Sequence, residues 1–272
     1  MAILGAAAFW DRSPEVAGTS LRLALDRGVN HLDVAPQYGE AQRSLGPHLP
    51  AVRDQLFVAC KTLRKNADGV RAQLEESLAL LGCDGFDLYQ AHAVTDLAAL
   101  DERAAAFDVI LRARDEGVVR FAGITGHDMT APGTFVEALR RYDLDTVMFP
   151  VNPRVWGDSA YRRDAEALLE LCAERDVGVM AIKAAARRPW DGRDRWATTW
   201  YEPHRDPEAV RRGVHFALSV PGVAAFCTPG DVDVLPVALD AAESYAGPVD
   251  LEAAIAAEAG EELIFPIAEK AV

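Results

Sequence analysis

Four residues able to do acid–base chemistry lie at or just after the ends of apolar segments. Asp33, Lys61 and His92 are each the last residue of such a segment, and Tyr38 lies in the turn that follows Asp33. An ionisable side chain at the end of a buried strand is costly unless it is paired or required for chemistry. We therefore predict that these four side chains converge in space.

The residue types indicate proton transfer to a carbonyl oxygen. A lysine held near Asp33 keeps its positive charge, which favours the tyrosinate form of Tyr38 and lowers the pKa of that phenol. A tyrosine tuned in this way donates a proton as negative charge develops on the carbonyl, and His92 orients the carbonyl or assists the transfer. No strong nucleophile accompanies the set, which suits a reaction whose electrons come from elsewhere, such as a hydride donor.

Short apolar segments alternate with helical patterns along the whole chain, which predicts a parallel sheet. The expected strands are Ile3–Phe9, His31–Asp33, Leu56–Lys61, Phe86–His92, Phe121–Ile124, Thr146–Pro150, Gly178–Ile182 and Ala224–Cys227. The expected helices are Pro14–Arg27, Glu40–Leu45, Ala67–Leu81, Leu100–Glu116, Pro132–Arg141, Arg163–Arg175, Pro207–Ser219 and Asp233–Tyr245.

About eight β–α units without a composition break predict an α/β chain folded as a (β/α)₈ TIM barrel, as a single domain over residues 1–272. The last part, 251–272, is expected to be a helical tail. No Gly-x-Gly-x-x-Gly follows the first strand, which disfavours a Rossmann unit. In a barrel the carboxyl ends of the strands form the active-site face, so Asp33, Tyr38, Lys61 and His92 are expected to meet there.

One segment interrupts the alternation and is expected to wall the substrate pocket. Ala184–Asp206 is long for a β–α loop and rich in aromatic and basic residues. Loops of this length are usually functional or disordered, and its three tryptophans favour a lid. The expected pocket residues are Phe9, Trp10, Trp156, Trp190, Trp196, Trp200 and Tyr201.

Composition excludes several classes of partner. A formal net charge of −14 disfavours nucleic acid and anionic membranes. The four cysteines form no Cys-x-x-Cys pair, so buried reduced thiols are expected. The chain lacks a long apolar segment and a basic region before its first strand, which places it in the cytoplasm by this interpretation.

The segments that contain the four residues carry a family resemblance. Gly28–Glu40 places an aspartate before a Tyr-Gly pair, Val58–Thr62 contains the lysine, and Asp87–His92 ends in the histidine. In this order they resemble the aldo-keto reductase family, in the branch with Gly-Ile-Thr-Gly-His after the fifth strand. The resemblance continues through Gly117–His127, Gly178–Lys183 and Ser219–Val223.

The resemblance implies an NAD(P)(H)-dependent oxidoreductase that moves hydride between nicotinamide and a small carbonyl or alcohol substrate. Tyr38 would be the proton donor, with Asp33, Lys61 and His92 as its partners. Thr125, His127 and Asn152 would border the nicotinamide, although His127 suits a bond to a neighbouring loop and Asn152 a turn equally well. Along the phosphates and adenosine would lie Lys183, Thr228, Gly230, Asp231 and Asp240.

The chain departs from the family pattern in three places. Family members that prefer NADP(H) carry a basic residue soon after Pro-Gly in the last β–α loop, whereas Asp231 and Asp233 follow Gly230 here. Two carboxylates would repel a 2′-phosphate, which favours NAD(H) unless Lys183 or Arg187 holds that phosphate. Ile182 takes the place of the aromatic residue that often stacks on nicotinamide, and the family's N-terminal hairpin is expected to be absent.

Three other functions remain open. The same fold could serve as a lyase, dehydratase or epimerase with bound or no nucleotide. A metal-dependent hydrolase could draw ligands from His31, Asp33, His92, His127 and Asp128, although Lys61 would compete with the metal. A non-enzymatic subunit that binds the cofactor is a third possibility. No metal is expected in the preferred interpretation.

Overall fold

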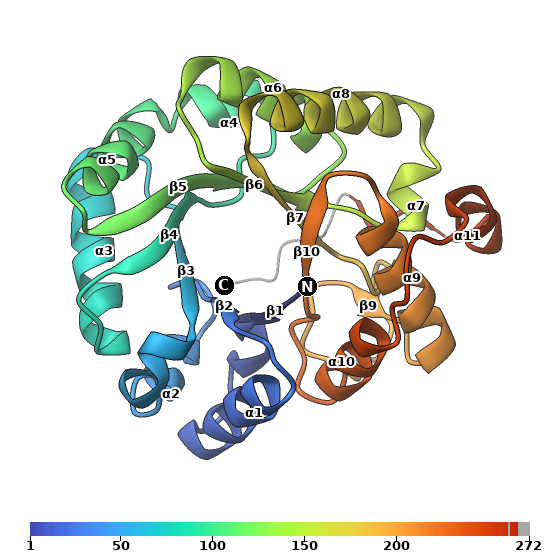
Figure 1. The fold of residues 1–272 in the computed structure, drawn as a ribbon, viewed down its shortest axis with the longest axis horizontal. Helices are drawn as coiled ribbons and strands as arrows, with labels where there is room; N and C mark the ends of the chain where they lie inside the picture. The colour runs from blue at the N-terminus through green and yellow to red at the C-terminus, as the bar shows by residue number, and fades with distance from the viewer. Residues whose placement is uncertain (261, 266–272) are drawn as a thin grey trace.

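The computed structural model describes residues 1–260 and 262–265, and it confirms the eight-stranded parallel TIM barrel. The strands close in the order β1-β10-β7-β6-β5-β4-β3-β2 (Figure 1). Their bounds are β1 Ala2–Gly5, β2 His31–Asp33, β3 Phe57–Thr62, β4 Phe86–Ala91, β5 Val119–Thr125, β6 Thr146–Pro150, β7 Gly178–Ile182 and β10 Val223–Cys227.

Helices surround the barrel, as each β–α unit requires (Figure 1). The α-helices are α1 Pro14–Asp26, α2 Ala41–Leu45, α3 Ala67–Leu81, α4 Leu97–Asp101, α5 Ala104–Asp115, α6 Ala131–Arg141, α7 Pro153–Trp156, α8 Ser159–Arg175, α9 Pro207–Ser219, α10 Leu235–Glu243 and α11 Leu251–Ala257. Two 3₁₀ helices are η1 Ala6–Phe9 and η2 Leu49–Gln55.

Two expected elements are divided in the structure. The expected strand Ile3–Phe9 ends at Gly5 and continues as η1, because an Ala-rich apolar segment fits a strand and a helical turn equally well. The expected helix Leu100–Glu116 is α4 and α5, since the Asp96 carboxylate caps an earlier helix by accepting from Ala99 N at 2.7 Å. The short η2 and α7 were not predicted from the sequence.

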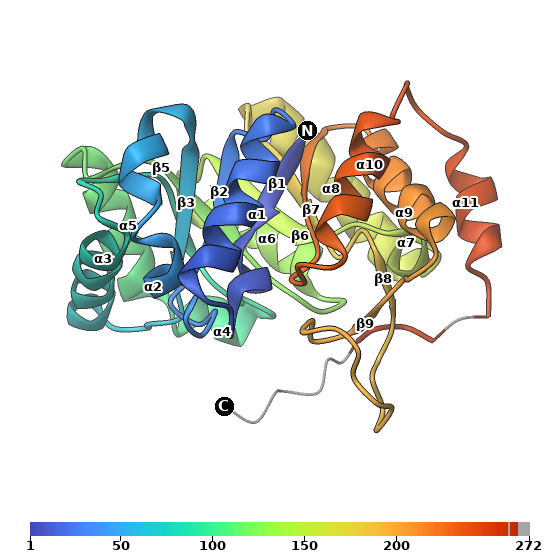
Figure 2. The same cartoon turned by 90° about the horizontal axis from the view of Figure 1, so that it is seen from below.

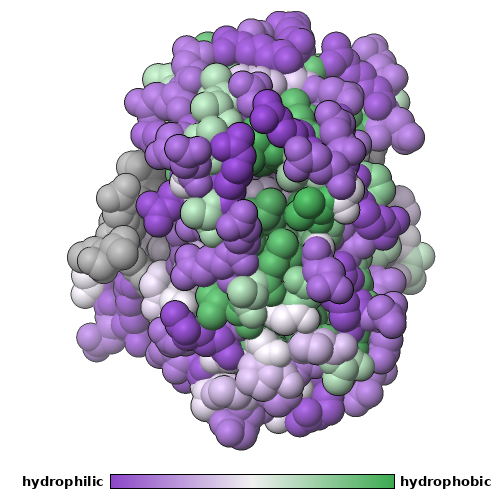
Figure 3. All heavy atoms as spheres, turned by 90° about the vertical axis from the view of Figure 1, so that its left-hand side faces the viewer, coloured by the Kyte–Doolittle hydropathy of each residue, from purple (hydrophilic) through white to green (hydrophobic). Residues whose placement is uncertain are grey.

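The barrel interior is apolar below the strand ends. Its filling side chains are Ile3, Ala59, Leu88, Met148, Met180, Ile182 and Ala225. A larger apolar layer packs between the strands and the outer helices. On the outside, over α3 and α5, hydrophilic residues surround a narrow apolar band (Figure 3). The polar groups at the carboxyl ends of the strands therefore lie directly above an apolar layer of side chains inside the barrel.

Buried Asp87 fixes the strand that leads to His92. Its carboxylate accepts from Val58 N on β3 at 2.8 Å, and it pairs with Arg53 at 2.8 Å and with Arg120 on β5 at 2.7 Å. These hydrogen bonds join three adjacent strands at one residue of β4. They set the register that carries β4 to the carboxyl end of the barrel.

The segment 184–206 forms a strap over the carboxyl ends of the strands, and Figure 2 shows it extending beyond the barrel. Its two arms pair as the antiparallel strands β8 (Ala186–Arg188) and β9 (Glu202–Pro203). The strap is tied to the loop after β10, where Thr198 N donates to Asp231 Oδ2 at 2.9 Å and Thr198 Oγ1 donates to the Gly230 carbonyl at 2.7 Å. The tether holds the strap over the pocket described below.

The expected helical tail is a helix only at its start. After α11, Glu258 pairs with Arg212 at 2.7 Å, and the chain then returns to the barrel with Ile264 and Phe265 buried. Residues 261 and 266–272, which complete the predicted tail, lie outside the described residues. Among the described helices, none is both long and apolar enough to span a membrane.

Gly213 on α9 makes a close approach that a side chain cannot accommodate. A Cβ there would lie 2.0 Å from the Ala184 carbonyl oxygen, where the strap begins. We expect Gly213→Ala to lower the free energy of unfolding by about 1–3 kcal/mol, despite the better helix propensity of alanine. Urea unfolding measures this change.

Gly133 on α6 is the matched control, because a Cβ there would lie 3.4 Å from the nearest atom, Asp164 Oδ2. Gly133→Ala is expected to stabilise the protein by about 0.5–1 kcal/mol. Equal effects of the two substitutions would show that the α9–strap approach is not tight.

The Asp231 carboxylate is the principal tether of the strap. Asp231→Ala removes the acceptor of two Thr198 donors, and hydrogen bonds to a charged group contribute about 1.5–3 kcal/mol each. We expect amide hydrogen exchange around Thr198–Trp200 to accelerate about 10-fold or more, as followed by mass spectrometry. Asp233→Ala, at an exposed neighbour, is the control. Unchanged exchange in Asp231→Ala would contradict the tether.

Candidate active site

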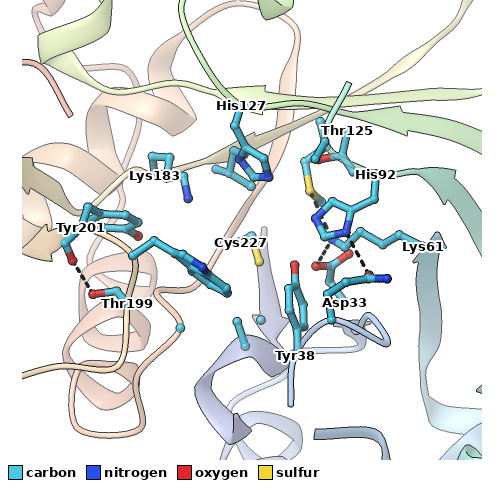
Figure 4. Close-up of a pocket in the computed structure, with 18 of the residues that line it drawn as sticks. Asp33, Tyr38, Lys61, His92, Thr125, His127, Lys183, Thr199, Tyr201 and Cys227 are labelled. Carbon is cyan, nitrogen blue, oxygen red and sulfur yellow. Dashed lines mark hydrogen bonds and ion pairs between the residues drawn. The ribbon is translucent and has the colours of Figure 1, made fainter. Parts of the chain in front are cut away.

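A cavity of about 940 Å³ opens at the carboxyl ends of the strands. Asp33, Tyr38, Lys61 and His92 all line it, from β2, the loop after β2, β3 and the residue after β4 (Figure 4). The convergence expected from the order of the strands is therefore present. The strap forms the opposite wall with Thr199, Trp200 and Tyr201.

Lys61 and Asp33 form a buried ion pair between Lys61 Nζ and Asp33 Oδ2, with each side chain 2% exposed. Lys61 Nζ also lies 5.5 Å from the centroid of the Tyr38 ring and 3.9 Å from Met148 Sδ. Burial lowers the pKa of Lys61, but the charge and hydrogen bond of Asp33, together with the smaller effects of Tyr38 and Cys227, outweigh burial and leave that pKa above its usual value. Lys61 is therefore cationic across the neutral range.

Tyr38 is buried beside this pair. Burial raises the pKa of Tyr38 and outweighs the opposing effect of the Lys61 charge, so the net pKa lies above the usual value. The sequence-based expectation of a lowered Tyr38 pKa is thus wrong in net direction, although the effect of Lys61 has the predicted sign. The phenol carries its proton at neutral pH, as a proton donor must.

His92 faces Tyr38 across the pocket. The two ring centroids are 6.0 Å apart, and His92 Nδ1 lies 3.3 Å from Gln37 Oε1. Burial, followed by the positive charge of Lys61, holds the pKa of His92 well below its usual range, so the imidazole is neutral. Gln37 was not singled out from the sequence, although it immediately precedes Tyr38.

His127 and Thr125 line the pocket next to His92, with the His92 and His127 ring centroids 5.8 Å apart. Burial and the Lys183 charge hold the pKa of His127 well below its usual range. Its buried Nδ1 has no hydrogen-bond partner among the described residues. The expected bond from His127 to a neighbouring loop is therefore not made through this nitrogen.

Asn152 lies behind the pocket wall. Its Oδ1 accepts from Val155 N at 3.0 Å, which caps α7, and its Nδ2 donates to the Lys183 carbonyl at 3.1 Å. Asn152 is not among the residues that line the cavity. The structure thus gives it the turn-forming role that the sequence left open, and Asn152 positions Lys183.

The aromatic residues predicted for the pocket divide into three groups. Trp10, Trp200 and Tyr201 line the cavity, and the Trp200 ring lies 5.7 Å from Trp10 and 6.0 Å from Tyr38 by centroid. Trp190 and Trp196 do not line the cavity and instead stabilise the strap. Trp190 Nε1 donates to the Thr199 carbonyl at 2.8 Å, and the Arg205 guanidinium lies 4.1 Å from the centroid of the Trp196 ring.

Phe9 and Trp156 do not line the pocket, contrary to expectation. Phe9 is fully buried in the core, because η1 turns its side chain away from the barrel mouth. Trp156 packs outside the barrel against Tyr161 and Phe216, with ring centroids 6.2 Å and 6.1 Å away. Both are apolar packing residues, which residue type alone could not distinguish from pocket aromatics.

The loop after β10 contributes Thr228 and Gly230 to the pocket lining. Asp231 is not among the residues that line the cavity, and its carboxylate accepts from Thr198 N and from Asp233 N, each at 2.9 Å. Asp240 lies on α10 and pairs with Arg27 at 2.7 Å, outside the pocket. The structure therefore gives both predicted cofactor carboxylates other partners within the protein.

Several pocket residues escaped the sequence analysis. Cys227 is the last residue of β10, so the rule that singled out Lys61 would also have found it. Arg195 and Thr199 lie within the predicted strap, whereas Phe265 carried no signal. The further lining residues not predicted individually include Gly5, Ala7, Leu63, Ala93, Thr95 and Met148.

The metal-hydrolase alternative finds no support in this geometry. Asp33 is engaged by Lys61, and His31 packs on Phe57 with ring centroids 4.6 Å apart. Over residues 1–260 and 262–265, no group of three or more His, Cys, Asp or Glu side chains is arranged to hold a metal ion.

Sequence comparison finds relatives that are named as oxidoreductases or dehydrogenases. The chain is 29% identical over 206 residues to D-threo-aldose 1-dehydrogenase from a Pseudomonas species, which covers 62% of this chain and 59% of that protein. It is 26% identical over 178 residues to the uncharacterized oxidoreductase YqkF of Bacillus subtilis, covering 60% of this chain and 54% of that protein. The chain thus spans little more than half the length of these curated relatives.

Solved structures share the fold over nearly the whole chain. Aldo-keto reductase AKR11C1 from Bacillus halodurans, in its holo form, matches with a TM-score of 0.70 at 20% identity, covering 94% of this chain and 91% of that one. An aldo-keto reductase from Klebsiella pneumoniae in complex with NADPH matches with a TM-score of 0.68 at 20% identity, covering 94% and 89%. The sequence profile of the Aldo/keto reductase family matches residues 3–195, and the chain therefore belongs to that family.

Proposed function

We propose that this protein is an NAD(P)(H)-dependent oxidoreductase that reduces a small carbonyl compound, or oxidises the corresponding alcohol. The observation that carries the proposal is the meeting of Tyr38, the Lys61–Asp33 ion pair and His92 in one pocket. Relatives named as reductases and dehydrogenases support it.

Each residue of this set has a separate role in the proposal. Tyr38 donates the proton to the carbonyl oxygen, and the cation of Lys61 stabilises the negative charge left on the phenol. Asp33 keeps Lys61 cationic and fixed in position. Gln37 Oε1 can only accept, so Nδ1 of neutral His92 carries the proton of this contact, and the His92 ring, held in place by Gln37, orients the substrate carbonyl beside Tyr38.

The pocket suits a nicotinamide dinucleotide. The buried Nδ1 of His127, which has no hydrogen-bond partner among the described residues, favours a polar ligand in contact with this wall. Thr125 and His127 would border the nicotinamide, and Thr228 and Gly230 would border the phosphates. When bound, this cofactor supplies the hydride.

The choice between NADH and NADPH follows from charge near the adenosine end. Since Asp231 is engaged by the strap, exposed Asp233 is the carboxylate near Gly230 that would face a 2′-phosphate. Arg187, the cation considered for that phosphate, lies 3.4 Å from Glu202. We propose that the protein uses NADH at least as well as NADPH, although structural relatives bind NADPH. A titration with both dinucleotides tests this.

Tyr38→Phe removes the proposed proton donor and keeps the ring. Loss of a general acid costs about 10²- to 10⁴-fold in rate, so turnover of aldehydes and ketones with NAD(P)H should fall by that factor. The dissociation constant of the dinucleotide should change little, because the ring remains. Steady-state absorbance of NAD(P)H and fluorescence titration measure the two quantities.

Tyr201→Phe is the matched control, since Tyr201 lines the same pocket on the strap side. Its rate should stay within a few-fold of the wild-type rate. Undiminished turnover in Tyr38→Phe would contradict the assigned role. Conversion of a substrate without any change in NAD(P)H would instead indicate the redox-neutral lyase or epimerase alternative.

A further inference from the structure

Lys183 is a second buried lysine of the pocket, and its charge is not compensated by the protein. It is 9% exposed, and it follows the last residue of β7. Among the described residues, no carboxylate forms an ion pair with it, and the titratable neighbours that affect its pKa are the Cys227 thiol and the Lys61 ammonium. A buried ammonium without a counter-charge is costly, in contrast to Lys61, which Asp33 neutralises.

The fold holds Lys183 in this place. Its φ of +66° lies in the left-handed region, which is strained for a residue with a side chain, and Asn152 Nδ2 binds its carbonyl at 3.1 Å. The ammonium lies 4.7 Å from the centroid of the Tyr201 ring and 5.8 Å from that of Trp200. Aromatic faces stabilise a cation without neutralising it.

The direction in which the Lys183 side chain points indicates which part of the pocket its ligand occupies. Figure 4 shows the side chain pointing into the space bounded by His127, Tyr201 and Cys227, across the pocket from Tyr38 and His92. The Lys183 ammonium and the Tyr38 ring centroid each lie within 6.0 Å of the centroid of the Trp200 ring. Lys183 and the proposed proton donor therefore line the same cavity.

Among the described charges around this space, Lys183 is the buried cation without a compensating carboxylate. Lys61 and Asp33 neutralise each other, and burial keeps His92 and His127 neutral. Asp128 also lines the cavity, where its Oδ1 accepts from Met129 N at 2.7 Å, and it forms no ion pair with Lys183 among the described residues. Arg195 adds a further positive charge to the lining.

We propose that Lys183 binds an anionic group of the substrate, and that the substrates are small aldehydes, ketones or hydroxy compounds that carry a carboxylate or a phosphate. An ammonium presents three donors to such a group. With the anion on Lys183, the reacting carbonyl reaches Tyr38 and His92. This inference rests on the proposed function for the identity of the reaction.

The same anion could in principle belong to the cofactor pyrophosphate. The position of Lys183 favours the substrate, because Lys183 follows β7 rather than lying in the loop of Thr228 and Gly230, and its ammonium lies 5.8 Å from the centroid of the Trp200 ring, which also contacts Tyr38. The experiment below separates the two sources by measuring dinucleotide affinity alongside substrate selectivity.

Lys183→Met keeps the length and apolar stem of the side chain and removes the charge. With succinic semialdehyde and butanal, four-carbon aldehydes that differ in one carboxylate, we expect the ratio of their kcat/KM values to fall about 10- to 100-fold. Lys65→Met, at an exposed lysine paired with Glu102, is the control and should leave the ratio unchanged.

Binding without reaction provides a second readout. Trp200 fluorescence should report butyrate binding to the wild type, with about 10-fold or greater weakening in Lys183→Met, and butyramide should not distinguish the two proteins. If Lys183→Met weakens NADH and NADPH binding and leaves the aldehyde ratio unchanged, the anion site belongs to the cofactor and the inference fails. Intact butyrate discrimination without turnover of any carbonyl would overturn the proposed function alone.

The pH dependence of butyrate binding has a defined sign. Burial, with help from the Lys61 charge, lowers the pKa of Lys183 to about 8. The groups facing it are His92, His127, Cys227, Tyr201 and Trp200, none of which supplies a negative charge at neutral pH. Lys183 is cationic below its pKa and neutral above it, so butyrate affinity should fall up to about 10-fold per pH unit above pH 8. Affinity that stays constant from pH 7 to 9.5 would contradict the inference.

Discussion

The buried ion pair between Lys61 and Asp33 is the interaction on which the rest of the site depends. Neither charge is tolerable alone above the apolar filling of the barrel, since removing one partner of a buried pair costs about 3–5 kcal/mol. The pair exists only because β2 and β3 are adjacent and in register, with Asp33 opposite Ala59. Closure of the barrel thus creates the charge arrangement, and that arrangement holds the Lys61 cation beside Tyr38.

The strap performs the complementary task of enclosing this charge. Trp200 lies over both Tyr38 and Trp10, and the hydrogen bonds of Thr198 to Asp231 and Gly230 fix that position. The carboxylate at 231 therefore has a structural partner, which changes how the acidic loop should be interpreted. A residue that looked like an electrostatic obstacle to NADPH is also the anchor of the pocket wall.

The sequence predicted the barrel because two signals can be recognised without the tertiary structure. They are the alternation of strand and helix patterns and the residues that begin and end helices. Proline at the first turn after Asp206 fixed the start of α9, and buried polar ends marked Asp33, Lys61 and His92. It could not place Phe9 or Trp156, since an aromatic side chain packs equally well in a core or a pocket. The sequence-based prediction of a lowered Tyr38 pKa was also wrong, because burial raises that pKa. The extent of burial depends on segments such as the strap, which cover Tyr38 only in the folded chain.

The two pocket lysines show how one fold places the same residue in two different electrostatic environments. Lys61 is held cationic by Asp33, whereas Lys183 lies against aromatic rings with no carboxylate and is easily deprotonated. The difference is topological: β2 brings an aspartate to β3, while β7 ends beside Cys227 of β10 and Asn152, which binds backbone rather than charge. A protein that compensates one buried cation and not another leaves the second to be neutralised by what it binds.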